Sequence, residues 1–365
     1  MKYLKTFETH AEYDLYINGE NVYLPNVSLT LDDNTMHFLD EIPIQTDPYK
    51  YLTIEALEDD FIVWIEKPVE DSGGLMSLRQ TNIISDGELL YCIDNDNIWY
   101  NYEFGTDTPT INKGQTISFK GLLNTTVDYK GVCIFYTNDK KFNLKGNCLS
   151  IIFGDDCDKN FDLTNYNYCF DNLFSYSLVV NISKTFLPAT TLAEYCYSHM
   201  FSDCIYLTTA PELPSTTLEY GCYDSMFNNC ESLATAPELP ATTLAGSCYN
   251  NMFQNCTSLT MAPELPATTL TDYCYYNMFY GCTSLTTAPD LPATELASCC
   301  YDTMFADCSK LNYIKAMFTT MKGSLTIYGW VSGVAPTGTF VKNKNATWDV
   351  IGEDGIPYGW TVQTA

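Results

Sequence analysis

The sequence predicts a multi-domain protein of the α/β and β classes, with a solenoid of 26-residue units after a β-sandwich-like domain. Two observations lead to this prediction. One phrase is repeated five times over 187–316, and short apolar runs separated by turn residues precede it. A fixed period of this length means that each unit buries its apolar face against its neighbours. The anchor cysteines lie 26 residues apart, at Cys196, Cys222, Cys248, Cys274 and Cys300.

The third unit shows what each repeat is expected to form. Leu244, Cys248, Met252 and Cys256 are four residues apart, which is the spacing of one helix stripe. We therefore predict a short helix over 244–254. The segment 258–262 alternates in polarity and predicts a short strand, which two following prolines keep short.

The remaining segments are assigned by their patterns. Residues 46–153 hold short strands and a hairpin signal around 94–97, and they predict the β-sandwich-like domain. Residues 154–186 echo the repeat phrase and predict a degenerate capping repeat. The solenoid of five units covers 187–316. Residues 317–365 are rich in Gly and Trp and predict a β-rich C-terminal cap, and residues 1–45 form an N-terminal attachment segment.

The stripe residues are expected to form the structural core of the solenoid, as small thiols and thioethers that fill a tight interior. On a helix the two cysteines of one unit would lie roughly 12 Å apart, too far for a disulfide, and their spacing does not match zinc patterns. We therefore expect reduced thiols. The core set is Cys196, Met200, Cys204, Cys222, Met226, Cys230, Cys248, Met252, Cys256, Cys274, Met278, Cys282, Cys300, Met304 and Cys308.

Two sets of residues are candidates for a binding surface. Tyrosines recur at one register position, where packing on the next unit is favoured over a carbohydrate platform. Residues that vary between units on the predicted helical side could recognise a ligand selectively, although drift at solvent-facing positions is slightly favoured as their explanation. The candidates are Tyr197, Tyr223, Tyr249, Tyr275, Tyr301, Asn250, Asn251, Tyr276 and Asn277.

The charge pattern excludes several classes of function. The net charge is −27, and 187–309 contains 13 acidic residues and no lysine or arginine, so nucleic acid and anionic membranes are not expected as partners. The acidic column Glu212, Glu238, Glu264 and Asp290 is expected to be solvated, since no calcium-loop spacing accompanies it. Three scattered histidines and one arginine give no catalytic motif. We expect no enzyme activity, no metal and no cofactor.

The phrase Leu-Pro-Ala-Thr-Thr-Leu, followed by Cys-Tyr-x-x-Met-Phe-x-x-Cys and Ser-Leu-Thr-x-Ala-Pro-Glu, resembles the BspA-type leucine-rich repeat proteins of Bacteroidetes over about 187–316. The tail motifs at 338–343 and 355–362 resemble the end of the same proteins. This resemblance implies a leucine-rich-repeat fold and a surface-exposed role in binding or adhesion. The segments 3–9 and 24–28 resemble the N-terminal segments of structural proteins from Bacteroidetes phages.

These resemblances lead to two alternatives. The first is a phage virion protein, such as a fibre, decoration or tail-associated component, made in the host cytoplasm. Its N-terminal region would contact other virion proteins, and its repeats would contact a host surface protein or glycan. The first alternative also fits the lack of an apolar run of signal-peptide length at the N-terminus. The second is a bacterial cell-surface adhesin, and a carbohydrate-active enzyme is a third, less favoured interpretation. We expect no membrane insertion and a homo-oligomer.

Overall fold

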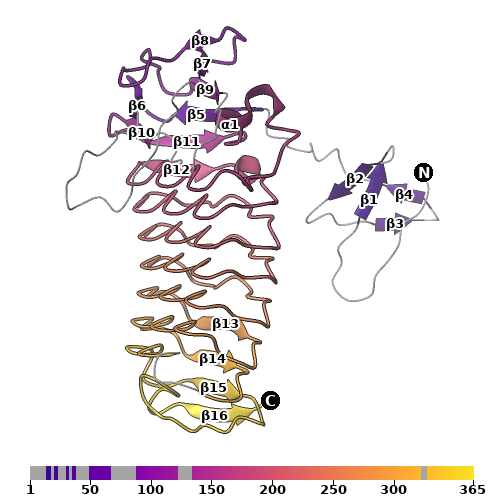
Figure 1. The fold of residues 1–365 in the computed structure, drawn as a ribbon, viewed down its shortest axis with the longest axis vertical. Helices are drawn as coiled ribbons and strands as arrows, with labels where there is room; N and C mark the ends of the chain where they lie inside the picture. Colours follow the sequence, from indigo (N-terminus) through magenta and orange to yellow (C-terminus); the bar gives the residue numbers. More distant parts are fainter. Residues whose placement is uncertain are drawn as a thin grey trace. The chain divides into compact units, whose positions relative to one another are not determined.

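The computed structural model describes residues 49–66, 88–121, 134–321 and 327–365, together with four short strands between residues 14 and 37 (Figure 1). The chain divides into two compact units, Met1–Thr46 and Asp47–Ala365. The first unit has two antiparallel hairpins, β1 (Asp14–Ile17) with β2 (Glu20–Tyr23) and β3 (Thr30–Asp32) with β4 (Thr35–His37). The phage-like segments 3–9 and 24–28 lie outside the described residues.

The second unit begins with a six-stranded sheet in the order β12-β11-β5-β9-β7-β8. Its neighbours are antiparallel except for β11 and β12. A separate antiparallel pair joins β6 (Val63–Glu66) to β10 (Ile134–Thr137). The six strands are β5 (Leu52–Ala56), β7 (Leu89–Ile93), β8 (Tyr100–Asn101), β9 (Thr116–Gly121), β11 (Phe142–Lys145) and β12 (Val179–Ile182).

One hydrophobic core runs through this whole unit, from Leu52 in the sheet to Trp360 near the C-terminus. Strand β12 belongs to the first coil of the repeats, and its pairing with β11 makes the sheet continuous with them. The segments predicted from the sequence as a β-sandwich-like domain, a capping repeat, a solenoid and a C-terminal cap therefore lie in one compact unit.

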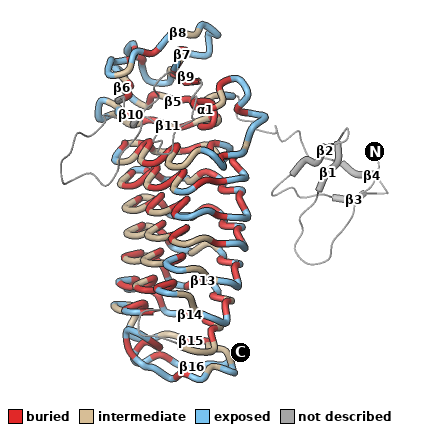
Figure 2. Tube along the Cα trace, viewed as in Figure 1, coloured by how far each residue is buried: buried red, intermediate tan, exposed pale blue. Residues whose placement is uncertain are grey.

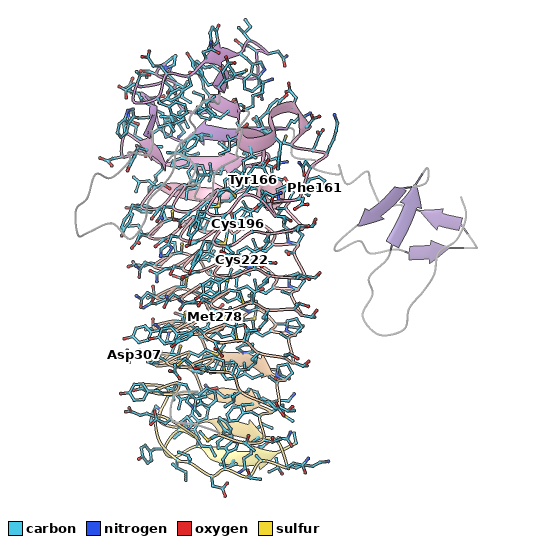
Figure 3. The ribbon with its side chains drawn as sticks, in the orientation of Figure 1. Phe161, Tyr166, Cys196, Cys222, Met278 and Asp307 are labelled. Carbon is cyan, nitrogen blue, oxygen red and sulfur yellow. The ribbon has the colours of Figure 1, made fainter. Side chains whose placement is uncertain are left out.

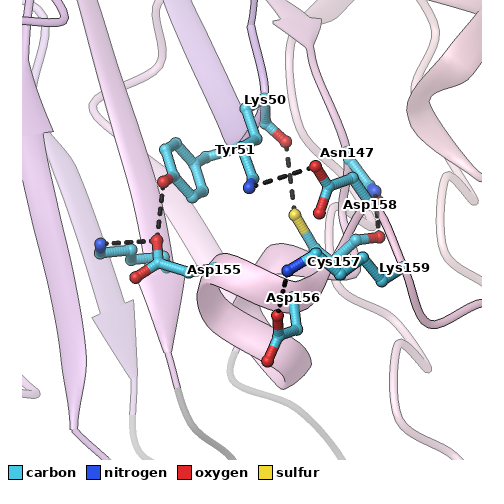
Figure 4. A network of polar contacts seen from close by, with 9 residues as sticks. Lys50, Tyr51, Asn147, Asp155, Asp156, Cys157, Asp158 and Lys159 are labelled. Carbon is cyan, nitrogen blue, oxygen red and sulfur yellow. Dashed lines mark hydrogen bonds and ion pairs between the residues drawn. The ribbon is translucent and has the colours of Figure 1, made fainter.

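A short helical connection, α1 (Ser150–Phe153) and η1 (Gly154–Asp156), fastens the sheet to the first coil (Figure 4). The Ser150 hydroxyl accepts from the Leu52 amide and donates to the Phe119 carbonyl, both at 2.8 Å. The Tyr51 hydroxyl donates to Asp155 Oδ1 at 2.7 Å, and this carboxylate also receives the Lys120 ammonium at 2.9 Å. Buried and half-buried polar groups at this junction are thus paired.

From Leu163 onward the chain winds in coils that stack in register (Figure 1). The Tyr249 amide donates to the Cys274 carbonyl at 3.1 Å, and the Phe253 amide donates to the Met278 carbonyl at 3.0 Å, both in the next coil. Equivalent bonds repeat from coil to coil. Since a single coil leaves these amides without partners, the backbone itself joins each unit to the next.

The helix predicted over 244–254 is wrong, because this segment is a succession of turns. Every fourth residue is left-handed, with φ of 55° at Ser247, 53° at Asn251 and 58° at Asn255. Amide groups alternate between two kinds of acceptor. Met252 donates within the coil to Tyr249 at 3.3 Å, whereas Phe253 donates to the next coil. A four-residue turn period buries the same stripe as a helix, so the apolar pattern alone does not separate them.

The left-handed positions explain the Asn, Asp and Gly residues at this edge of the coils, since these residues tolerate positive φ. Their side chains also form ladders between coils. Asn255 donates to Asn229 Oδ1 at 2.9 Å, and Asn229 donates to Asp203 Oδ1 at 2.8 Å. At Gly281, the next position in this column, an added Cβ would lie 2.2 Å from Asn255 Oδ1. Glycine is therefore required there by both φ and space.

Buried residues recur in the successive coils of the stack (Figure 2), and many of them form columns of identical residues. Phenylalanine rings of successive coils stack with centroids 5.7 to 5.8 Å apart from Phe201 to Phe305. Figure 3 shows Cys196, Cys222 and Met278 inside the stack and Asp307 at its edge. Trp330 occupies the core position that Met304 holds one coil earlier, and its indole donates to the Gly355 carbonyl at 2.8 Å.

The opposite side of the stack carries parallel pairing. The strand predicted over 258–262 is reduced to a single bridge between Thr235 and Met261. Toward the C-terminus the bridges widen into a four-stranded parallel sheet of β13 (Thr287–Leu291), β14 (Tyr313–Ala316), β15 (Thr339–Lys342) and β16 (Thr361–Thr364). The Phe305 amide still donates to the Trp330 carbonyl at 2.9 Å. The segment predicted as a cap thus continues the coils.

Candidate functional site

The five tyrosines predicted at one register position are buried and form no surface. Tyr197, Tyr223, Tyr249, Tyr275 and Tyr301 are each 1 to 2% exposed. Their rings stack from coil to coil with centroids 5.8 to 5.9 Å apart. Burial raises the pKa of Tyr223 well above its usual value. A ligand cannot reach this column, so the carbohydrate platform is excluded at these residues and packing is their role.

The other predicted binding residues lie at the turn edge and are half-buried. Asn277 donates from Nδ2 to Asn251 Oδ1 at 3.0 Å, so these two belong to an inter-coil ladder. The buried Asn250 Oδ1 has no hydrogen-bond partner among the described residues. Tyr276 lies beside Tyr273, with ring centroids 5.8 Å apart. Of this set, Tyr276 contributes to the exposed aromatic surface described below.

The predicted core residues, Cys196 through Cys308 with their methionines, are all fully buried. The cysteines are free thiols. In the second cysteine column each thiol lies near the carbonyl of a phenylalanine one coil earlier. Cys230 Sγ is 3.2 Å from the Phe201 oxygen, and Cys256 Sγ is 3.2 Å from the Phe227 oxygen. Burial raises the pKa of Cys204 to about 12. These thiols are packing groups with weak donor bonds, as buried free cysteines commonly are.

A second set of tyrosines, which we call the tyrosine ridge, lies on the surface of the turn edge. Tyr168 and Tyr195 stack with centroids 4.8 Å apart and planes 11° apart, and Tyr220 meets Tyr195 edge-on at 5.4 Å. Tyr220 is 44% exposed and Tyr273 is 43% exposed. The ridge consists of Tyr168, Tyr195, Tyr220, Tyr273 and Tyr276.

Three of the ridge tyrosines occupy left-handed positions, with φ of 58° at Tyr168, 54° at Tyr195 and 58° at Tyr273. A left-handed conformation costs an ordinary residue roughly 1–2 kcal/mol. Apart from Tyr176, the coils elsewhere place small or polar residues at such positions. Backbone strain of this kind is concentrated at functional sites in proteins, so the ridge is a candidate functional surface.

Glycines make room for the ridge in the second and third coils. A Cβ at Gly221 would lie 2.4 Å from the Tyr195 ring, and a Cβ at Gly246 would lie 2.9 Å from the Tyr220 ring. At Gly221 the left-handed position carries no side chain, and the neighbouring Tyr220 supplies the ring. The third coil has no ridge tyrosine, so Tyr273 and Tyr276 form a separate end.

The ridge presents neutral hydroxyls in acidic surroundings. Burial, followed by the neighbouring Tyr220 and Tyr168, raises the pKa of Tyr195 well above its usual value, so its hydroxyl remains a donor at neutral pH. Glu194, Glu219 and Asp272 are exposed along the same turn edge. The arrangement offers apolar ring surface, hydroxyl donors and carboxylate acceptors.

The acidic column, predicted to be solvated, is exposed in the structure. Lysines lie at both of its ends. Lys184 is 3.8 Å from Glu212, and the Lys315 ammonium donates to Asp290. Among the described residues no three His, Cys, Asp or Glu side chains are grouped so as to hold a metal ion.

One serine, one histidine and one aspartate meet at the first coil without forming a relay. Ser198 Oγ lies 2.7 Å from His199 Nδ1, and Asp171 Oδ1 lies 3.8 Å from the same nitrogen. A hydrolase triad needs the nucleophile and the carboxylate on opposite ring nitrogens. This cluster therefore lacks the geometry for nucleophile activation.

Sequence reasoning missed Tyr168, Tyr195, Tyr220 and Tyr273. The sequence did contain one signal for them, which is variation at a single position of the repeat. This position is Tyr195 and Tyr273 in two units and Gly221, Ser247 and Cys299 in the others.

No helix in the described part of the chain is long and apolar enough to cross a membrane. Comparison of the chain with family models, curated proteins and solved structures found no match.

Proposed function

We propose that this chain is a non-enzymatic binding protein that holds a saccharide along its tyrosine ridge. The observation that carries this proposal is the placement of three ridge tyrosines at left-handed positions of the turn edge, where Tyr273 is exposed and Tyr168 and Tyr195 are half-buried. Tyrosine combines a flat apolar ring with a hydroxyl, which suits a partner with both C–H faces and hydroxyl groups. The ridge tyrosines form two groups on either side of the third coil, which fits a chain of sugar units long enough to contact both groups.

The charge of the coils selects among saccharides. Their acidic side chains favour neutral sugars over uronic or sialic acids, since like charges repel. Carboxylates next to the rings, such as Glu219, can accept hydrogen bonds from sugar hydroxyls. The same charge argues against polyanions, including nucleic acid.

We further propose that the protein is a phage virion component, with its N-terminal unit joined to other virion proteins and its coils directed to a host glycan. The phage-like segments 3–9 and 24–28 support this setting. The alternative is a cell-surface adhesin of the BspA type. Mass spectrometry of purified particles separates the two, because the first requires the protein in the particles and the second requires it on intact cells.

A glycan array tests the ridge directly. The double variant Tyr195→Asn with Tyr273→Asn keeps residues that tolerate positive φ and removes two rings. Each aromatic contact contributes about 0.5–1.5 kcal/mol beyond its buried area, so affinity should fall roughly tenfold or more. Tyr358→Ala is the matched control, since Tyr358 is 72% exposed and lies outside the ridge. Equal binding by the double variant and the control would contradict the proposal.

A further inference from the structure

A cavity of about 300 Å³ lies where β10 meets the turn edge of the first coil. The Phe135 amide donates to the Leu173 carbonyl at 3.1 Å, which fixes β10 against this coil. The cavity is lined by Tyr136, Asp139, Asn172, Ser175 and Tyr176, among others. Its volume is at the lower end of the range for small-molecule sites, which suits a ligand of one ring.

Tyr176 departs from the pattern of its column. Its φ is 62°, and the equivalent residues of the following coils are Asp203, Asn229, Asn255 and Gly281, which tolerate that conformation. The Tyr176 side chain is nevertheless 76% exposed, so burial does not compensate for the backbone strain. The strained residue lies on the wall of the cavity, which connects the outlier to a binding role.

The cavity combines aromatic and polar groups without a cationic side chain in its lining. Tyr136 is 39% exposed, and its ring lies 5.1 Å from that of Trp64. Asp139 supplies an exposed carboxylate, and the half-buried Asn172 also lines the cavity. Ser175 also lines the cavity, and its hydroxyl donates to the Ser202 carbonyl at 3.3 Å.

We propose that this cavity binds a single neutral sugar ring, as a site separate from the tyrosine ridge. Tyr176 and Tyr136 provide ring contacts, and Asp139 and Asn172 bond to sugar hydroxyls. The inference rests on the proposed saccharide-binding function for its ligand class only. The site itself is defined by other residues, since Tyr176 occupies the third left-handed position of its coil and the ridge residue Tyr168 the first.

Saturation-transfer NMR with the full chain and a panel of neutral methyl glycosides tests the cavity. Wild type should bind at least one of them, and Tyr176→Asn should weaken that binding at least tenfold. Asparagine suits the left-handed backbone, so the melting temperature should stay equal or rise. Tyr358→Ala and the ridge double variant should both bind the glycoside as wild type does.

Either of two results would overturn the inference: no neutral glycoside binds wild type, or Tyr176→Asn binds the glycoside like wild type. If the ridge double variant loses binding on the glycan array and wild type binds no methyl glycoside, the cavity proposal is wrong and the ridge proposal stands. If glycoside binding depends on Tyr176 and the ridge double variant binds the glycan array like wild type, the ridge proposal is wrong and the cavity proposal stands.

Discussion

Substitution of Ser247 by glycine and by alanine should distinguish the turns of the coils from the helix that the sequence suggests. Ser247 has φ of 55° and is 8% exposed, and its amide donates to the Asp272 carbonyl at 3.0 Å in the next coil. Both substitutions remove the same small hydroxyl and keep this amide. The difference between the two variants therefore isolates the backbone conformation.

In a left-handed turn the glycine variant should be more stable than the alanine variant by about 1–2 kcal/mol, because alanine carries a Cβ. In a helix the order reverses, and glycine should be about 1 kcal/mol less stable than alanine. In urea unfolding, where the free energy of unfolding falls by about 3 kcal/mol per molar urea, a difference of about 1–2 kcal/mol between the two variants corresponds to a difference in midpoint of about 0.5 M.

Ala245→Gly is the matched control, since Ala245 immediately precedes the turn that contains Ser247 and has no positive φ. There glycine should destabilise by about 0.5–1 kcal/mol. A Ser247→Ala variant that is more stable than Ser247→Gly would refute the left-handed turn.

Three further predictions follow from the buried columns. Met252→Ala should lower the free energy of unfolding by about 2–5 kcal/mol, because Met252 is fully buried, whereas Asn250→Ala should cost under about 1 kcal/mol; equal small losses in urea would contradict the packing. Alkylation of the folded protein followed by intact-mass measurement should leave the coil cysteines unmodified until denaturant is added, and rapid labelling without denaturant would contradict their burial. Burial raises the pKa of Cys196 and Cys248 from 9.0 to about 12, so between these values only the thiols of the unfolded chain ionise. The melting temperature should therefore not depend on these thiols below pH 9.0 and should fall as the pH rises toward about 12. A constant melting temperature between pH 9.0 and about 12 would contradict the raised thiol pKa values as a source of stability.

The period of the coils is visible in the sequence because stacking repeats one environment, so the same residue returns 26 positions later. The local backbone was not predictable from the apolar stripe. A four-residue turn and a helix both bury Cys248 and Met252, and only the neighbouring Gly, Ser and Asn residues at 246, 247, 250 and 251 favour the turn. The same residues are also compatible with sequence variation on the solvent-facing side of a helix.

The sequence predicts a cap after 316 because the core residues of the C-terminal coils differ from the repeated phrase, although the pairing between coils continues there. Trp330 replaces the methionine of the phrase, and Gly329 and Gly333 take the left-handed positions.

The column of tyrosines predicted as a binding surface lies two residues from the ridge column in sequence, and the apolar pattern does not separate the two. Tyr195 and Tyr197 are near neighbours in sequence, but one lies on the ridge and the other in the core. The cavity beside Tyr176 depends on the packing of β10 against the first coil, which no local pattern indicates.

Tyrosine nitration mapped by mass spectrometry, with and without the glycan that the array identifies, tests the central claim most directly. Tyr220, Tyr273 and Tyr358 are all exposed in the free protein and should all react. Bound glycan should protect Tyr220 and Tyr273 and leave Tyr358 as reactive as before. Unchanged modification of the two ridge tyrosines in the complex would contradict the assignment of the ridge as the contact surface.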